Sequence, residues 1–365
     1  MLLPIRCFKL AEKPSRTDCG AHNSGTRSLM DELDVLCVGN AIVDIIARCE
    51  DTFLIENAIT KAAMNLIDAE RSELLYSRMG PAIEASGGSA GNTAAGVASF
   101  GGKSAFFGKV ARDHLGEIYR HDITAQGVVF QTEPLEGPPP TARSMIFVTP
   151  DGERSMNTYL GACVELGPED VDEAIVAASK VTYFEGYLWD PPRAKEAIRN
   201  CADIAHANGR EMSMTLSDPF CVDRFRDEFL DLMRSGTVDI VFANEHEAMS
   251  LYQTASLETA INTMAEECAL AIVTMGERGS VVARKNERAS VEAIEIAELV
   301  DTTGAGDLYA SGFLYGYTNG RSLEDCARLG SLAAGLVIQQ IGPRPHQSLR
   351  QAGIDSGLMA AFTAG

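Results

Sequence analysis

The sequence predicts an α/β fold with three layers, in which helices cover both faces of a mainly parallel sheet and a small β-sheet forms a lid. The first observation is that short apolar runs alternate with helix-like stretches from Asp34 onward, a pattern typical of a parallel sheet flanked by helices. The second is that two segments, at about 41–68 and 141–163, interrupt this alternation and read as additional strands. Strands outside the main sheet suit a lid that closes over a cleft.

The apolar runs have the length of buried strands. The first, 35–38, ends at Gly39, as expected of a strand covered on both faces. Further strands are expected at 104–107, 145–148, 181–184, 211–216, 238–242, 269–274 and 280–283. Helices are expected between them at 167–178, 192–207, 222–234 and 257–267. Pro168 stands where the first turn of a helix tolerates proline.

Composition argues against several classes of partner. The 365 residues include 31 Lys and Arg against 51 Asp and Glu, a net charge of −20 that repels phosphate backbones and anionic lipid. We therefore expect neither a nucleic-acid nor a membrane partner, and no apolar run reaches the roughly 20 residues of a membrane span. The nine cysteines form no C-x-x-C pair, which disfavours a thiolate zinc site and fits a reducing cytoplasm.

The chain divides into three parts. Residues 1–32 are expected to form a weakly ordered extension, because 1–10 contain only a few apolar residues and 11–30 are polar and mixed. Residues 33–350 contain all of the strand–helix alternation and are expected to form the main domain, with the lid strands inserted in it. Residues 351–365 read as a C-terminal tail or helix.

The segment Asp301–Asp307, which reads D-T-T-G-A-G-D, carries the strongest chemical signal. It precedes a helix-like stretch, so its small residues leave backbone N–H groups exposed at a helix start, where they bind anions. Asp307 stands beside these donors, where a carboxylate can take a proton from an attacking hydroxyl. Taken alone, the segment also fits an ordinary turn with an N-terminal aspartate.

Three more segments contribute polar groups. The paired glycines before Ser89 and Asn92, in G-G-S-A-G-N, let a ligand approach the backbone, and Asn92 offers a donor and an acceptor to a polyol. Asn244 and Glu247 share a helix face, where their oxygens suit Mg²⁺ held through water, although the pair taken alone fits a simple helix N-cap better. The turn at 274–280 either covers a triphosphate or is a plain hairpin turn.

These four segments, in this order, resemble those of the PfkB or ribokinase-like family of carbohydrate and nucleoside kinases, over roughly residues 34–345. The resemblance implies a ribokinase-like fold, a Mg²⁺-dependent transfer from ATP, and in some relatives a potassium ion at Asp301 and Thr303. On the phosphate side the matching residues are the base Asp307, the anion hole Gly304, Ala305 and Gly306, the pair Asn244 and Glu247 that organises Mg²⁺ and phosphate, and the nucleotide loop Thr274, Gly276 and Gly279.

Within the family the chain most resembles the adenosine kinases. The segment Leu216–Phe220, L-S-D-P-F, is similar to one whose Phe lines their nucleoside pocket. Asp44 matches the acidic residue that holds sugar hydroxyls, and Arg154 lies in a lid turn whose Arg can reach phosphate. The remaining residues expected on the acceptor side are Asn40, Gly88, Ser89 and Asn92 around the sugar, and Tyr187 and Met64 with Phe220 around the base.

The expected reaction is therefore phosphorylation of the 5′-hydroxyl of adenosine by ATP. Thr303 departs from this branch, because eukaryotic adenosine kinases have Asn there and Thr is the commoner choice in sugar kinases. Ribose, fructose or another nucleoside thus stays open as the acceptor. An idle nucleoside-binding regulator is a further alternative, and the resemblance implies either a monomer or a homodimer paired through its lids.

Overall fold

The computed structural model describes residues 32–360. Its main sheet has eight strands. Their spatial order is β13 (Glu287–Val291), β12 (Ser280–Arg284), β11 (Leu270–Thr274), β10 (Ile240–Asn244), β9 (Glu211–Thr215), β8 (Ser179–Glu185), β1 (Leu33–Val38) and β5 (Ser104–Phe107). Strands from β5 to β11 are parallel, and β12 and β13 add an antiparallel edge.

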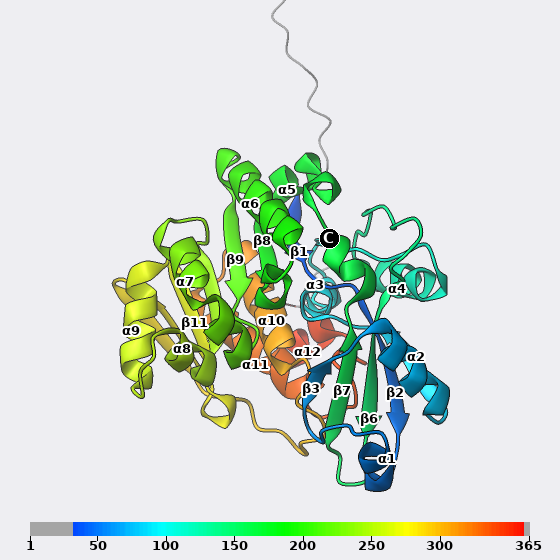
Figure 1. Ribbon diagram of the computed structural model, residues 1–365. Coiled ribbons are helices and arrows are strands. Elements are labelled where there is room, and N and C mark those ends of the chain that lie inside the picture. Colours follow the sequence, from blue (N-terminus) through cyan, green and yellow to red (C-terminus); the bar gives the residue numbers. More distant parts are fainter. Residues whose placement is uncertain (1–31, 361–365) are drawn as a thin grey trace, which may run out of the picture.

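Helices cover both faces of this sheet (Figure 1). One face packs against α5 (Glu173–Ala178), α6 (Pro192–Ala207), α7 (Pro219–Arg234), α8 (Glu245–Leu251) and α9 (Leu257–Glu267). The other packs against α3 (Ser89–Ser99), α4 (His114–Ala125), α10 (Ala305–Thr318) and α11 (Leu323–Val337), with α12 (Leu349–Asp355) behind α11.

Strand β1 is an example of how the sheet is buried on both faces. Successive side chains of a strand point to opposite faces, so an uninterrupted apolar run supplies two cores at once. Leu36 and Val38 belong to the core that contains Ile198 of α6. Val35 and Cys37 belong to the core that contains α10. The continuous apolar runs of the sequence therefore correspond to strands between two helical layers.

A second, five-stranded sheet forms the lid beside the main sheet (Figure 1). Its order is β3 (Met64–Leu66), β7 (Arg154–Tyr159), β6 (Ala142–Val148), β2 (Ile42–Arg48) and β4 (Ala82–Ser86). Helices α1 (Asp51–Glu56) and α2 (Ala69–Arg78) lie on its outer side, where Leu54 and Leu75 pack with Ile45 of β2. Ile42 and Asp44 alternate with these apolar residues and face a cavity instead.

Three details differ from the sequence-based expectations. The edge strand β13 was not expected, because it is largely exposed and has no apolar run. Strand β4 lies outside the expected lid ranges, because its first residues, Ala82 and Ile83, are exposed at the edge of the lid and give no alternating pattern. The single helix expected at 167–178 is wrong. A 3₁₀ turn at Pro168–Asp170 closes when the Asp170 side chain accepts the N–H of Gly167, and Asp172 then caps a separate helix, α5.

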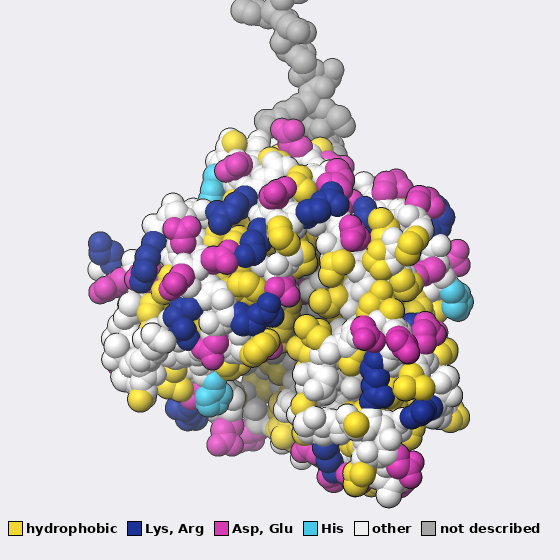
Figure 2. Space-filling view, in the orientation of Figure 1, with side chains coloured by type: hydrophobic (Ala, Val, Ile, Leu, Met, Phe, Trp, Pro, Cys, Tyr) yellow, Lys and Arg dark blue, Asp and Glu magenta, His cyan; other side chains and the backbone are white. Residues whose placement is uncertain are grey.

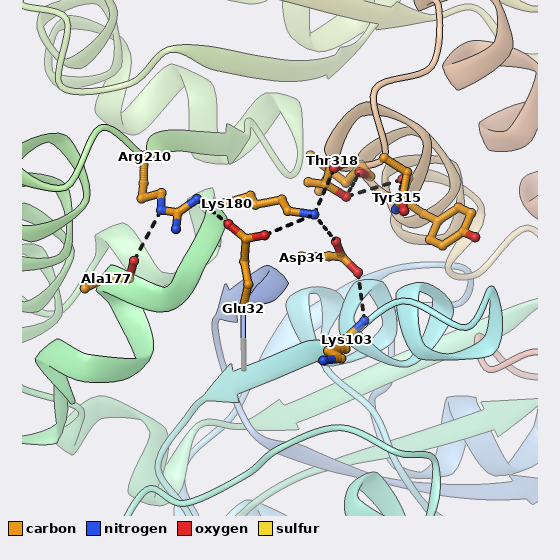
Figure 3. A network of polar contacts seen from close by, with 10 residues as sticks. Glu32, Asp34, Lys103, Ala177, Lys180, Arg210, Tyr315 and Thr318 are labelled. Carbon is orange, nitrogen blue, oxygen red and sulfur yellow. Dashed lines mark hydrogen bonds and ion pairs between the residues drawn. The ribbon is translucent and has the colours of Figure 1, made fainter. Parts of the chain in front are cut away.

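A charged network fixes the start of β1 (Figure 3). Lys180 Nζ lies 2.9 Å from a carboxylate oxygen of Asp34 and 3.8 Å from one of Glu32, and Arg210 Nη1 lies 2.9 Å from Glu32. Except for Glu32, the extension expected at 1–32 lies outside the described residues. Among residues 32–360, no helix is both long enough and apolar enough to cross a membrane.

Candidate active site

A cavity of about 690 Å³ lies between the lid and the carboxyl ends of the central parallel strands. Figure 2 shows a hollow between the lid, at the lower right, and the rest of the molecule, with hydrophobic side chains around it. The final residues of β8, β10 and β11 line the cavity: Glu185, Asn244 and Thr274. Ligands of open α/β sheets bind at this edge, where loops after the strands bring polar groups together.

Asp307 lies in the first turn of α10 and lines this cavity. Its two carboxylate oxygens accept hydrogen bonds from Ser89 Oγ at 2.6 Å and from Asn92 Nδ2 at 2.9 Å. Burial raises the pKa of Asp307, and the hydrogen bonds from Ser89 and Asn92 oppose that rise. A fixed carboxylate whose pKa is above its usual range is suited to act as a general base near neutral pH.

Gly304 shapes the start of α10. Its φ of +78° lies in the left-handed region, and a Cβ there would stand 2.6 Å from Cβ of Pro343. A helix start leaves its first N–H groups without intrahelical partners, so they can face an anion. Gly304, Ala305 and Gly306 all line the cavity as expected. The N–H of Ala305, however, donates to the Thr302 carbonyl at 3.2 Å and that of Leu308 to the Gly304 carbonyl at 2.8 Å, so the N–H groups of Gly306 and Asp307 are the better anion donors.

Asp44 is 9% exposed and faces the cavity from lid strand β2. Burial raises the pKa of Asp44 to about 7, although the charges of Arg344 and Arg154 lower it. Gly88 also lines the cavity, and its φ of +84° with the Asn40 carbonyl only 2.1 Å from the position of a Cβ excludes any side chain there. The Asp44 carboxylate and the bare backbone of Gly88 thus lie on the acceptor side of the cavity, which Asn40 also lines.

Glu185 is a site residue that sequence reasoning missed. It is 1% exposed, and its carboxylate accepts the backbone N–H of Asn40 at 2.9 Å, Asn40 Nδ2 at 2.6 Å and the N–H of Ala90 at 2.8 Å. Burial raises the pKa of Glu185 to about 7. Glu185 therefore joins the end of β8 to both loops that frame the acceptor side. Its position directly after an apolar run and before Gly186 was the available signal.

Asn244 and Glu247 form a reciprocal capping box at the start of α8. The Asn244 side chain accepts the N–H of Glu247 at 2.9 Å, and the Glu247 carboxylate accepts the N–H of Asn244 at 2.9 Å. The helix-cap alternative is therefore what the structure contains. Both residues nevertheless line the cavity, and burial raises the pKa of the Glu247 carboxyl, which is 4% exposed, to about 7.

The expected nucleotide loop is only partly at the cavity. Thr274 lines it, whereas Gly276 and Gly279 lie in the turn between β11 and β12 and do not. The reason is that β11 and β12 are hydrogen-bonded neighbours, so the turn between them projects beyond the strand end. The plain hairpin-turn interpretation thus fits these two glycines in this structure.

Arg154 and Asp301 occupy positions that differ from two expectations. Neither lines the cavity, because Arg154 Nη2 lies 2.5 Å from Asp301 Oδ2 in an ion pair whose side chains are 9% and 5% exposed. The same carboxylate accepts the N–H groups of Thr303 at 3.0 Å and Gly342 at 2.9 Å. With a guanidinium and two N–H groups on the Asp301 carboxylate, its side chain is not arranged to hold potassium. Arg154 is directed at this loop and not at a phosphate site.

This ion pair predicts a stability effect. Replacing Arg154 by Gln leaves the buried Asp301 carboxylate without its cation, so we expect the free energy of unfolding to fall by about 3 kcal/mol. Urea denaturation at pH 7 measures it. Arg328→Gln is the matched control, since Arg328 pairs with Glu324 at 50% and 55% exposure and should lose less than about 1 kcal/mol. Equal losses in the two variants would show that the Arg154 pair contributes no more than a surface pair.

The three side chains expected around a base are cavity walls and not core. Phe220, Tyr187 and Met64 are 65%, 36% and 40% exposed, and all three line the cavity. Asp218 caps α7 by accepting the N–H of Cys221 at 2.6 Å, so Phe220 falls in the first turn of that helix. The Tyr187 hydroxyl donates to the carbonyl of Ser217 at 3.3 Å, which fixes the ring at the mouth.

Fold and site together define a class of enzyme. Residues 33–349 match the family described as pfkB family carbohydrate kinase, and the chain belongs to this family. It is a kinase, a phosphotransferase whose acceptor is an alcohol group. The expected ribokinase-like fold is confirmed by the solved structures to which the chain is similar.

Individual relatives show which members of the family this chain is similar to. The chain is 70% identical to an adenosine kinase from Sinorhizobium meliloti, over 89% of this chain and 100% of that one, with a TM-score of 0.85. It is 73% identical to a probable sugar kinase from Rhizobium etli CFN 42, over 90% and 100%, with a TM-score of 0.86. It is also 30% identical to adenosine kinase 2 of Arabidopsis thaliana, over 84% of this chain and 94% of that protein. The expected likeness to adenosine kinases is thus confirmed.

Proposed function

We propose that this enzyme transfers the γ-phosphoryl group of ATP to the 5′-hydroxyl of adenosine, producing AMP and ADP. The observation that carries the proposal is the placement of two carboxylates in one cavity, the buried Asp44 and the half-buried Asp307. Asp307 lies at the head of α10 beside the first-turn N–H groups, and Asp44 faces the same space from the lid. One carboxylate is available to take a proton, and the other to accept sugar hydroxyls.

In the proposed reaction Asp307 accepts the proton of the 5′-hydroxyl while the hydroxyl oxygen attacks the γ-phosphorus of ATP. A new O–P bond forms, the bond from phosphorus to the β–γ bridging oxygen breaks, and ADP leaves with that electron pair. The transferring group carries negative charge, and the N–H groups at the start of α10 face it with the positive end of the helix dipole. Catalysis of this kind depends mainly on positioning and electrostatic stabilisation.

A magnesium ion bound with ATP would supply further neutralisation of phosphate charge. Within residues 32–360, no cluster of three His, Cys, Asp or Glu side chains is arranged to hold a metal. Mg²⁺ often keeps several waters and binds through one or two carboxylates together with substrate phosphates, and Glu247 on the cavity wall fits that role. Potassium at Asp301 and Thr303 has less support, because Arg154 already holds Asp301.

The apolar mouth of the cavity favours a nucleoside over a simple sugar. Phe220, Tyr187 and Met64 offer exposed surface for a flat base, whereas ribose or fructose has no group to fill that space. A structure to which this chain is 25% identical, with a TM-score of 0.75, is an Anopheles gambiae adenosine kinase in complex with P1,P4-di(adenosine-5) tetraphosphate. A site that accepts two adenosines joined by phosphates corresponds to an acceptor and an ATP bound together.

The acceptor is tested by comparing kcat/KM with ATP for adenosine, inosine, guanosine, ribose and fructose. We expect adenosine to exceed both sugars by at least about 10-fold, since base stacking alone contributes about 1–3 kcal/mol. A preference for ribose or fructose would replace the acceptor in the proposal while leaving the kinase assignment intact. Tight adenosine binding without any product from the five acceptors would favour the non-catalytic regulator.

Phe220→Ala is predicted to raise KM for adenosine about 10-fold, because the lost stacking is worth about 1–3 kcal/mol. Steady-state kinetics with adenosine and with ribose at saturating ATP measures the change. Since Phe220 is 65% exposed at the mouth, its removal should leave the fold and any KM for ribose unaltered. An unchanged KM for adenosine would remove Phe220 from the base site.

We also propose that the enzyme works in a reducing cytoplasm. The cysteines within residues 32–360 are all free thiols, and five of them, Cys37, Cys163, Cys201, Cys221 and Cys326, are buried. Buried free cysteines act as small apolar side chains and do not need an oxidising compartment. The proposed partners are adenosine or a related acceptor and ATP, in a monomer or a homodimer that ultracentrifugation can distinguish.

A further inference from the structure

The loop after α11 reaches the candidate active site, although no sequence pattern pointed to it. The N–H of Gly342 donates to Asp301 Oδ2 at 2.9 Å. Pro343 is buried, lines the cavity and leaves no room for a side chain on Gly304. Arg344 follows directly. Gly342, Pro343 and Arg344 therefore all contact residues in or beside the site, and Arg344 adds a positive charge.

Arg344 contacts α3 through a fork of donors. Its Nε donates to Asn92 Oδ1 at 2.8 Å, and its Nη2 donates to the carbonyl of Gly87 at 3.4 Å. Its Nη1 donates to Gln126 Oε1 at 2.7 Å, at the end of α4. The guanidinium is thus fixed between two helices, with its hydrogen bonds directed at the loop that begins α3.

The contact with Arg344 and the contact with Asp307 favour the same orientation of the Asn92 amide. A guanidinium has only donors, so it must meet the oxygen of the amide and not the nitrogen. The opposite end of the amide, Nδ2, then donates to Asp307 Oδ2 at 2.9 Å. A flipped amide would direct its oxygen at the Asp307 carboxylate and its nitrogen at the guanidinium, so Arg344 adds a second contact that disfavours the flip. The chain Arg344–Asn92–Asp307 is therefore polarised in one direction.

We propose that Arg344 is a positioning residue for the catalytic base, which orients the Asn92 amide toward Asp307 and stabilises the ionised carboxylate with its charge. This inference rests on the proposed role of Asp307. It assigns to Arg344 no contact with substrate, because Arg344 itself does not line the cavity.

The charges around Asp307 explain why a cation is needed there. Burial raises the pKa of Asp307, whereas Ser89, Asn92 and the charge of Arg344 lower it. Besides burial, the charge of Asp307 raises the pKa of five other groups, all of them acidic or neutral: Asp44, Glu185, Cys37, Tyr183 and Tyr187. Arg344 also lowers the pKa of Asp44, together with Arg154. Loss of Arg344 should therefore raise the pKa of Asp307, and a base must lose its proton to act.

The test compares Arg344→Gln with Arg344→Lys in the full chain, measuring kcat against pH at saturating adenosine and ATP. In Arg344→Gln the acidic limb of the kcat profile should move upward by about one pH unit, since a neighbouring opposite charge shifts a carboxyl pKa by about 1–3 units. We expect kcat at pH 7 to fall about 10-fold or more. Arg344→Lys keeps the charge but not the fork, so its limb should stay near the wild-type position while kcat falls.

Arg328→Gln provides the matched control, because the same substitution on the exposed face of α11 should leave kcat and its pH limb unchanged. The proposal would be overturned if Arg344→Gln kept the wild-type kcat and the wild-type position of the acidic limb. So would equal losses in both Arg344 variants without a shifted limb but with weakened adenosine binding and a lower Tm, which would mean a purely structural role. Failure of the base assignment itself would instead appear as activity retained by Asp307→Asn.

Discussion

Asp307→Asn is expected to lower kcat by about 10³- to 10⁴-fold while adenosine still binds. General-base catalysis contributes about 10²- to 10⁴-fold, and the amide cannot accept the hydroxyl proton. Its nitrogen would also face one of the two donors, Ser89 Oγ or Asn92 Nδ2, which now bond to different carboxylate oxygens. The expected loss therefore lies at the upper end of that range.

Rapid-quench measurement of kcat with calorimetric measurement of the adenosine Kd separates chemistry from binding. Asp231→Asn, on an exposed position of α7, is the control for the substitution itself and should keep wild-type kcat. Wild-type turnover in Asp307→Asn would remove the base from the mechanism. Loss of adenosine binding together with loss of turnover would indicate that Asp307 supports the fold and not the chemistry.

Asp44→Ala is expected to raise KM for adenosine by about 100-fold or more, with a much smaller change in kcat. A hydrogen bond to a charged group contributes about 1.5–3 kcal/mol, and the carboxylate is proposed to accept two ribose hydroxyls. Asp44 faces the cavity from the lid, whereas Ser89 and Asn92 contact Asp307, so its removal should spare the base.

The pH dependence of KM gives a second signature of Asp44. Burial raises the pKa of Asp44 to about 7 in the free enzyme. Since hydroxyls donate to the ionised form, KM should rise as pH falls through 7, and this dependence should flatten in Asp44→Asn. Glu185 and Glu247 also have pKa values raised to about 7 by burial, so only the part of the profile lost in the variant belongs to Asp44. A KM near that of wild type in Asp44→Ala would contradict the sugar-binding role.

Local sequence patterns were sufficient for seven of the eight strands of the main sheet and for the catalytic loop. The strand expected at 104–107 is β5 to the residue, because a buried parallel strand is apolar on both faces and ends at its loop. Gly304 and Asp307 could be assigned because the small residues and the carboxylate of a helix start lie within a few positions of one another. The edge strands β4 of the lid and β13 of the main sheet were missed because an exposed edge strand has no such pattern.

Contacts between distant residues could not be read from such patterns. Arg344 and Asn92 are 252 positions apart, and Glu185 and Asn40 are 145 apart, yet each pair is in hydrogen-bond contact at the site. Arg154 was expected to reach phosphate, but the folded lid places it against Asp301 instead. The sequence identifies which side chains can do chemistry, while the fold decides which of them hold the others in position.

Product analysis tests the central claim most directly. The enzyme, ATP, Mg²⁺ and adenosine are incubated at pH 7, and the products are separated and identified by phosphorus and proton NMR. The expected result is 5′-AMP and ADP in equal amounts, with neither formed by Asp307→Asn. ADP without AMP, a phosphate on another hydroxyl, or conversion of ribose or fructose but not adenosine would contradict the proposed reaction.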